Sequence, residues 1–348
     1  MHAAPGPTRH LPTAPRRLAR RVTSAAFLLV VIAALTACGP ELGPIHKLVN
    51  LPGAQLPETS DPSVVENGGT YFVYGSDNHL RAPVTQITDL GRTYSLRDKN
   101  AVTSEAMPTK PAWTARARQT WAPTVAWIGD RWVMYFSADR PNPPQPTNPQ
   151  CLGMATSPSP LGPFTPEPGP AHCGINGTGG ALDPQFFHDP VTGQNWLLAA
   201  FGDTESPLHI MAVAQDGSLG PATTILGRQH PWEYHFIENP AMAYDPVRRN
   251  YLLTYSAGRW FEGAYSTGIA RCAAPTGPCT SDPSGPWIAS SAGRTGPGGL
   301  SFFTDRNGAT QGIFSTFAAG AEGRSGGRSA SILPLTLEPA VGLGDVVK

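Results

Sequence analysis

Three acidic residues, each followed closely by a proline, are the groups in this 348-residue chain whose types and spacing suit chemistry. They occur as Asp61-Pro62, Asp183-Pro184 and Glu238-Asn239-Pro240. Carboxyl groups that meet at one site suit hydrolysis of a glycosidic bond, because one must be protonated to release the leaving oxygen and another ionised to activate water. A third carboxylate nearby disfavours ionisation of the acid and so raises its pKa. The sequence predicts such a site if the fold brings the three acids together.

A repeat of about sixty residues predicts the elements that position these acids. Five marker segments begin at positions 61, 122, 183, 238 and 297, at intervals of 61, 61, 55 and 59 residues. Each of the first four is followed by a short apolar run, a polar turn and a second, aromatic-rich run that ends in small residues. Such a period, with room for four strands in each unit, predicts an all-β, five-bladed β-propeller.

In a propeller the first strand of each blade lines the central channel, so the three acids are expected at one mouth of that channel. The following proline suits the rim of a sheet, where it removes no ladder hydrogen bond. The alternative is that Asp-Pro is only a turn dipeptide, as it is expected to be at Asp189-Pro190 and Asp245-Pro246. Two markers, Ala122-Pro123 and Pro297-Gly298-Gly299, have no acid, so the repeat itself does not require one.

The N-terminal 38 residues are expected to be a signal peptide that precedes the fold. Two arginine pairs, at 16–17 and 20–21, come before an apolar run at 25–37, which is too short to cross a bilayer. Cys38 follows Leu35-Thr36-Ala37 and resembles the lipidated cysteine of a bacterial lipobox. The alternative is an ordinary secretory signal in which Cys38 is incidental. We expect a tether over residues 39–54 and a propeller domain over residues 55–348.

Cysteine usage and charge agree with an exported protein. Besides Cys38, the chain has four cysteines: Cys151, Cys173, Cys272 and Cys279. This even number predicts two disulfides. Three pairings are possible, and proximity favours Cys151–Cys173 and Cys272–Cys279; a metal site is disfavoured because no CxxC pair occurs. The net charge of zero offers no basic stripe for a nucleic acid. We expect a monomer whose only membrane contact is the lipid anchor, on the extracellular face of the cell membrane.

The ordered set of motifs resembles glycoside hydrolase family 43, over about residues 55–340. The matching segments are DP at Asp61, WAP at 121–123, LDP at 182–184, E-x-P at 238–240, YLLTYSAG at 251–258 and GPGG at 296–299. The resemblance implies an inverting five-bladed propeller enzyme that acts on arabinofuranosyl or xylosyl linkages of oligo- or polysaccharides. Asp61 would be the general base, Glu238 the general acid, and Asp183 the residue that raises the pKa of the acid.

Other site features also follow from this resemblance. Many family members carry histidine at the position of Gly299, where it holds an ion or a water network, so no cofactor is expected and the glycine argues against a channel calcium. Trp121, Tyr265 and Arg271 are the candidate substrate contacts, with blade packing as the alternative for Trp121. Two other functions stay open: a carbohydrate-binding propeller lipoprotein without turnover, and a glycosidase of a related five-bladed family that acts on another sugar.

Overall fold

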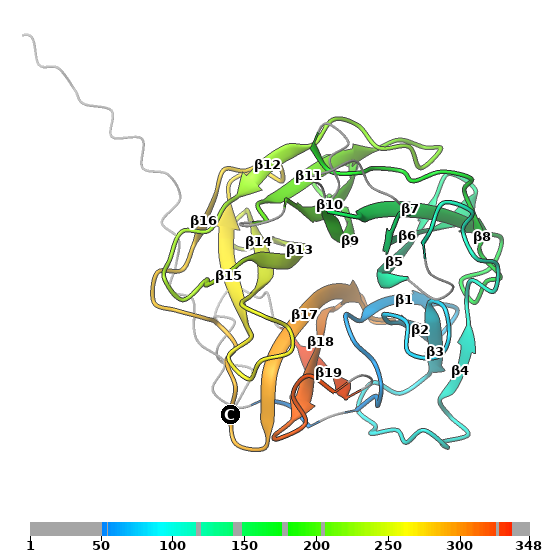
Figure 1. Ribbon diagram of the computed structural model, residues 1–348, viewed down its shortest axis with the longest axis horizontal. Coiled ribbons are helices and arrows are strands. Elements are labelled where there is room, and N and C mark those ends of the chain that lie inside the picture. The colour runs from blue at the N-terminus through cyan, green and yellow to red at the C-terminus, as the bar shows by residue number, and fades with distance from the viewer. Residues whose placement is uncertain are drawn as a thin grey trace, which may run out of the picture. The chain divides into compact units, whose positions relative to one another are not determined.

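Short apolar strands and polar turns fold into five antiparallel sheets that follow one another around a common axis (Figure 1). A computed structural model of the protein describes residues 51–53, 55–115, 120–141, 148–175, 180–202, 206–324 and 327–335. These residues belong to one unit, residues 42–348. The predicted signal peptide, with Cys38, and the tether up to residue 50 lie outside the described residues. The fold is the predicted five-bladed β-propeller.

Blade one contains β1 (Ser63–Asn67), β2 (Thr70–Tyr74), β3 (Pro83–Ile87) and β4 (Val102–Glu105). Blade two contains β5 (Trp121–Ile128), β6 (Arg131–Asp139), β7 (Gln150–Ser157) and β8 (Thr165–Pro166). Blade three contains β9 (Ala181–His188), β10 (Asn195–Phe201), β11 (Leu208–Val213) and β12 (Thr223–Leu226). Blade four contains β13 (Ile237–Asp245), β14 (Asn250–Ala257), β15 (Ser266–Cys272) and β16 (Cys279–Ser281). Blade five contains β17 (Arg294–Thr304), β18 (Thr310–Ala318) and β19 (Arg328–Pro334).

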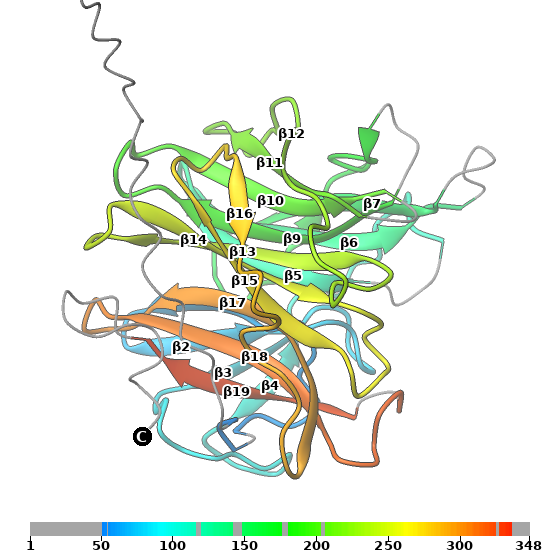
Figure 2. The same ribbon diagram turned by 90° about the vertical axis from the view of Figure 1, so that its left-hand side faces the viewer.

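The first strand of every blade lies on the inside of the ring, as the repeat predicts. Each of these five strands packs against the first strands of the neighbouring blades. Within each sheet the strands follow in chain order from this inner strand outward. In Figures 1 and 2, β9–β12 lie at the top and β17–β19 at the bottom, so blades three and five occupy different sides of the axis. The inner strands are therefore the elements that can present side chains to a central channel.

Apolar side chains fill the spaces between blades rather than one common core. Each of the five buried clusters joins two adjacent blades. Between blades three and four, for example, Phe187 and Leu198 pack with Tyr251 and Leu253. Burying one such side chain fully stabilises the fold by roughly 1.5–3 kcal/mol. This packing fixes the angle between blades and so fixes the relative positions of residues on different inner strands.

The ring is closed by residues from both ends of the domain. Blade five has three strands of its own, and Leu56 forms an isolated bridge with Ala330 at its outer edge. Gln55, Leu56 and Thr59 each donate a backbone N–H to a carbonyl of residue 330 or 328. Arg306, in the β17–β18 turn, also donates from Nε to the Tyr71 hydroxyl of blade one at 3.2 Å. Four strands were predicted for the last blade, and the N-terminal segment takes the place of the fourth.

Two disulfides tie loops to the outer strands. The bonds join Cys151 to Cys173 and Cys272 to Cys279, which are the pairings that chain proximity favours. Cys272 ends β15 and Cys279 begins β16, where the two residues face each other in the antiparallel register. A disulfide in a loop of this kind typically contributes roughly 2–4 kcal/mol.

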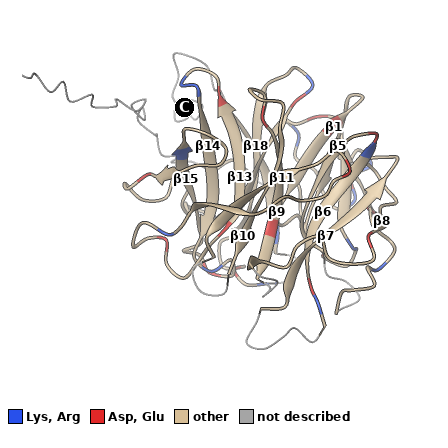
Figure 3. Ribbon diagram, turned by 90° about the horizontal axis from the view of Figure 1, so that it is seen from above, with Lys and Arg blue, Asp and Glu red and all other residues tan. Residues whose placement is uncertain are grey.

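Charged residues are concentrated in turns and loops at the ends of the strands, as Figure 3 shows. The strands themselves are mostly uncharged, in keeping with burial between blades. Over the described stretches, no helix has the length and apolar character needed to cross a membrane.

Candidate active site

A bulge interrupts the inner strands of blades two to five where they reach one mouth of the channel. In β5 the register shifts between Trp121 and Thr124, and in β13 it shifts between Glu238 and Ala241. The prolines of these four markers lie within the bulges and Pro62 directly precedes β1, so their missing N–H groups remove no ladder bond. In each blade one pocket-lining residue has a left-handed φ here: Asp61 (45°), Ala122 (44°), Asp183 (56°), Asn239 (48°) and Gly299 (63°). Aspartate, asparagine and glycine are the residues that tolerate this conformation best.

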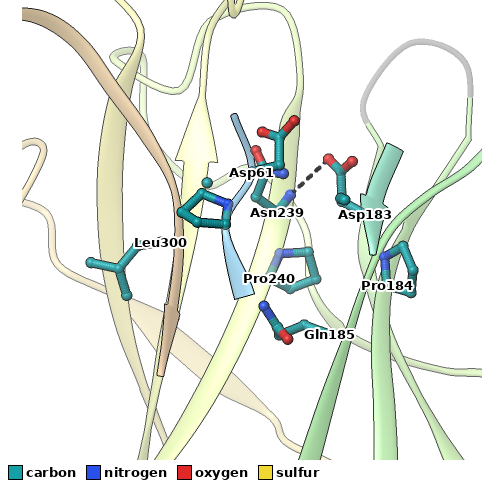
Figure 4. Close-up of a pocket in the computed structure, with 10 residues that line it drawn as sticks. Asp61, Asp183, Pro184, Gln185, Asn239, Pro240 and Leu300 are labelled. Atoms are coloured by element: carbon teal, nitrogen blue, oxygen red, sulfur yellow. Dashed lines mark hydrogen bonds between the residues drawn. The ribbon is translucent and has the colours of Figure 1, made fainter. Parts of the chain in front are cut away.

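The same five residues line one pocket at the centre of the ring. A β-bulge changes the direction in which a strand presents its side chains. Figure 4 shows the result: the Asp61 and Asp183 carboxyl groups point toward the same end of the pocket, away from Gln185 and Leu300. The bulge in β9 and the left-handed φ that Asp61 and Asp183 share thus explain why these acids, which lie on different blades, face a common space.

The structure corrects the predicted phase of Glu238. Its left-handed neighbour Asn239, not Glu238, is equivalent to Asp61 and Asp183. Glu238 precedes the left-handed residue by one position, as Trp121 does in blade two. In the fifth blade, likewise, the equivalent residue is Gly299 and not Pro297. The three acids therefore meet without occupying the same position in their repeats.

Asp61 is held by a serine hydroxyl from its own blade. Ser76 Oγ donates to Asp61 Oδ2 at 2.6 Å. The same Oγ accepts the backbone N–H of Ala122, in blade two, at 2.9 Å. Because an amide N–H can only donate, the serine proton is left for the carboxylate.

Asp183 connects blade three to the strand that carries Glu238. Its Oδ2 accepts the backbone N–H of Asn239 at 3.1 Å, the bond drawn in Figure 4. Between three other pairs of neighbouring blades, a serine hydroxyl instead accepts the N–H of the left-handed residue. Ser137 Oγ, for example, accepts the N–H of Asp183 at 2.8 Å. Burial raises the pKa of Asp183 well above its usual value, and the charges of Glu238 and Asp61 raise it further.

Glu238 is almost fully buried and is held by Tyr265. The Tyr265 hydroxyl lies 2.6 Å from Glu238 Oε1 and 2.7 Å from Asn239 Oδ1. Burial raises the pKa of Glu238 to about 7, the Tyr265 hydrogen bond opposes that rise, and the charge of Asp61 adds to it. Glu238 can therefore carry a proton near neutral pH, as a general acid must.

Burial is the largest cause of this raised pKa, and the charge of Asp61 adds to it. The sequence assigned the rise to Asp183, whose carboxyl also interacts with Glu238, because the charge of Glu238 raises the pKa of Asp183. The predicted effect of Asp183 on Glu238 stays a prediction. A buried guanidinium, Arg328, acts in the opposite direction and lowers the pKa of Glu238. Its Nη2 donates to the Gly296 carbonyl at 2.7 Å, and its charge lies 5.4 Å from the centre of the Tyr265 ring.

The three predicted substrate contacts have different locations. Tyr265 lies at the site, but its side chain is buried and contacts Glu238 rather than open space. Trp121 is half-buried beside Ala122, and its role in binding stays a prediction. Arg271 is buried in an ion pair with Asp245 at 3.3 Å.

Arg271 does not lie at the site because β15 runs away from it. Glu238 pairs with Ser256, which in turn pairs with Thr267. Arg271 is four residues further along β15, which corresponds to about 13 Å of extended strand. Its predicted contact with substrate is therefore wrong.

Some residues of the site escaped the sequence reasoning. Ser76 contacts Asp61, and the charge of Arg328 acts on Glu238. The sequence analysis identified neither residue. A usable signal existed, because a serine recurs near the end of the second strand in four repeats: Ser76, Ser137, Ser256 and Ser315.

The expectation that the channel holds no calcium stays a prediction. Hard cations bind carboxylate and carbonyl oxygens. In the channel, Ser63, Thr124 and Ser301 on the inner strands donate their hydroxyls to oxygens of Pro123, Gln185 and Pro62. A side chain at Gly299 would place its Cβ 3.0 Å from Asp61 Cα. In the described segments, no group of three or more His, Cys, Asp or Glu residues could hold a metal ion.

Comparisons with known proteins give one family. The model described as "Glycosyl hydrolases family 43" matches residues 56–339. The extracellular endo-α-(1→5)-L-arabinanase of Thermotoga petrophila is 26% identical over 248 residues, which cover 63% of this chain and 50% of the relative. A Bacillus subtilis extracellular endo-α-(1→5)-L-arabinanase is 26% identical over 273 residues, 71% of this chain and 54% of that protein. The chain thus spans about half the length of these curated relatives.

Solved structures share the fold. A thermostable family-43 glycoside hydrolase superimposes with a TM-score of 0.69 at 20% identity, over 84% of this chain and 95% of that one. The α-L-arabinofuranosidase of Lactobacillus brevis gives a TM-score of 0.66 at 18% identity, over 81% of this chain and 91% of that one.

Proposed function

The chain belongs to glycosyl hydrolase family 43, and we propose that it hydrolyses arabinofuranosyl or xylosyl linkages of oligo- or polysaccharides by an inverting acid/base mechanism. The observation that supports this most is the proximity of three acids: Asp61 and Asp183 line one pocket, and Glu238 lies next to the pocket-lining residue Asn239. The pKa of Glu238 is raised to about 7, with a contribution from the charge of Asp61. A binding protein needs no matched acid and base. The names of the curated relatives favour arabinan as the substrate.

In the proposed reaction, Glu238 donates its proton to the glycosidic oxygen as that bond breaks. Asp61 removes a proton from a water molecule, whose oxygen bonds to the anomeric carbon on the opposite face of the sugar. After the reaction Glu238 has lost one proton and Asp61 has gained one. Asp61 then releases its proton to solvent and Glu238 takes one up, which restores both starting states. Asp183 holds the Asn239 amide and so fixes the strand that carries Glu238. The inverting geometry predicts roughly 6.5–9.5 Å between the carboxyls of Asp61 and Glu238.

The direct test is hydrolysis by the purified protein. We expect release of sugar from 4-nitrophenyl α-L-arabinofuranoside or β-D-xyloside, or from polymeric arabinan. Proton NMR of the first product formed should show the anomer opposite to that of the substrate. Binding of these glycans without any turnover would instead support a carbohydrate-binding propeller.

The same assay tests the absence of a cofactor, which we propose from the donor set of the channel. Activity should be equal after treatment with EDTA and after addition of Ca²⁺. An activity that is lost in EDTA and restored by Ca²⁺ would contradict this part of the proposal.

We further propose that the protein is exported as a monomer and anchored on the outer face of the cell membrane through a lipid on Cys38. The apolar run at 25–37, the lipobox-like segment that ends at Cys38 and the extracellular relatives support this. In a bacterial host that processes lipoproteins, the wild type should fractionate with membranes and Cys38→Ala should not. Equal membrane association of both proteins would count against the anchor.

A further inference from the structure

We propose that Tyr265 and Ser76 are positioning residues that decide which oxygen of each catalytic carboxyl reacts. This inference rests on the proposed function of Glu238 and Asp61. Each hydroxyl contacts one oxygen of one carboxyl, Tyr265 at Glu238 Oε1 and Ser76 at Asp61 Oδ2. The oxygens left for chemistry are then Glu238 Oε2 and Asp61 Oδ1.

Tyr265 has one hydroxyl proton and two oxygen acceptors within hydrogen-bond distance, Glu238 Oε1 and Asn239 Oδ1. In the proposed arrangement this proton is donated to Glu238. Burial keeps it on the phenol, because burial raises the pKa of Tyr265 well above its usual value and the charge of Glu238 raises it further. Oε1 accepts this hydrogen bond at 2.6 Å, so the carboxyl proton of Glu238 is less stable on Oε1 than on Oε2. The proton of Glu238 is therefore directed to Oε2, away from Tyr265.

The Tyr265 ring cannot move away from this position easily. Its edge faces the backbone of Gly298, where an added Cβ would come within 2.1 Å of Cε1. Its face is covered by the Arg328 guanidinium. The absence of a side chain at Gly298 thus leaves room for the Tyr265 ring, which any larger residue would occupy. The ring is held in this position between blades four and five.

Ser76 serves Asp61 in the same way. Because its Oγ already accepts the Ala122 N–H, its own proton has a single direction, toward Asp61 Oδ2. Oδ1 is then the oxygen free to accept a proton from water. Ser256, the equivalent serine of blade four, accepts the N–H of Gly299 at 2.9 Å in the same manner, but no carboxyl is recorded among its hydrogen-bond partners.

The decisive experiment is the pH profile of Tyr265→Phe. On arabino-oligosaccharides, which have poor leaving groups, kcat should fall about 10- to 100-fold, because part of the general-acid contribution is lost. On an aryl glycoside with a good leaving group the loss should be under about threefold, since little proton donation is needed. The basic limb of kcat/KM should also move to higher pH, because the Tyr265 hydrogen bond lowers the pKa of Glu238.

Tyr255→Phe is the matched control. Tyr255 is a buried tyrosine of the same blade whose hydroxyl donates to Glu233, so its loss tests the structural cost alone. It should leave the basic limb and the leaving-group dependence unchanged. If Tyr265→Phe lowered kcat equally on both substrates with an unmoved basic limb, the positioning role would be wrong.

A second pair of variants tests Ser76. Ser76→Ala should lower kcat about tenfold on every substrate, because the base acts whatever the leaving group. Ser256→Ala removes a similar inter-blade bond and should cost less than threefold; equal losses would overturn the role of Ser76. A wild type without any hydrolysis would contradict the proposed function instead. Carbon-13 NMR titration of Glu238 in wild type and Tyr265→Phe would then still test the hydrogen bond, with no upward shift in the variant contradicting it.

Discussion

Glu238→Gln should lower kcat on arabino-oligosaccharides by about 10²–10⁴-fold, because general acid catalysis contributes about that much. Glutamine keeps the size of the side chain and can still accept the Tyr265 hydrogen bond, but it has no proton to donate. The basic limb of the kcat profile, which the Glu238 pKa of about 7 predicts for the wild type, should disappear. Parallel assays of kcat against pH on an oligosaccharide and on an activated aryl glycoside would check both effects.

The sign of this pH effect follows from the raised pKa. The active form of Glu238 is protonated, so wild-type activity should hold below a pH of about 7 and decline above it. Glu233→Gln provides the control, since Glu233 is also buried, in the segment just before β13, but accepts hydrogen bonds from Tyr255 and the Gln229 and His230 amides. It should lower thermal stability and leave the pH profile in place. Wild-type rates in Glu238→Gln on poor leaving groups would refute its assignment as the acid.

Asp61→Asn should lower kcat by about 10²–10⁴-fold on every substrate, including activated aryl glycosides. The base must remove a proton from water however good the leaving group is, so no choice of substrate compensates for its loss. Asparagine is the appropriate replacement because it tolerates the left-handed φ of 45° at this position. The loss should therefore appear in kcat with little change in melting temperature.

The control for Asp61 is Asp189, whose Asp-Pro dipeptide lies in a turn. Asp189 accepts hydrogen bonds from the Val191 N–H, the Thr192 hydroxyl and the Tyr251 hydroxyl, and it lies in the β9–β10 turn. Asp189→Asn should cost about 1 kcal/mol of stability through weakened hydrogen bonds and should not change kcat. If the two variants behaved alike, the Asp-Pro dipeptide at Asp61 would be structural as well.

The repeat in the sequence was sufficient to predict the propeller, because each unit holds the same order of strand, turn and strand. It was not sufficient to place Glu238. The Glu-Asn-Pro segment has one residue more than Asp-Pro, and spacing alone does not show which residue adopts the left-handed φ. The acid was found in the right strand but at a different position of the bulge.

The predicted roles of side chains were less accurate where they depended on the direction in which a strand runs. Tyr265 and Arg271 are close in sequence, yet one precedes β15 near the channel mouth and the other lies near its far end. The pKa of Glu238 was predicted to be raised, but its main cause, burial, depends on packing that a single sequence does not show. Arg328 could not be connected to Tyr265 from the sequence either, since 63 residues separate the two.

The closure of the ring has a consequence for the biosynthesis of the protein. Residues 55–59 pair with residues 328–330, so the contact between this N-terminal segment and blade five forms only after β19 has left the ribosome. Until then the apolar cluster that joins blades five and one lacks Ala330 and Ile332 of β19. The same last strand brings Arg328 to Tyr265, so a nascent or C-terminally clipped chain lacks a part of the electrostatic setting of Glu238. Closure of the ring and completion of the site's electrostatic setting thereby depend on the same strand, β19.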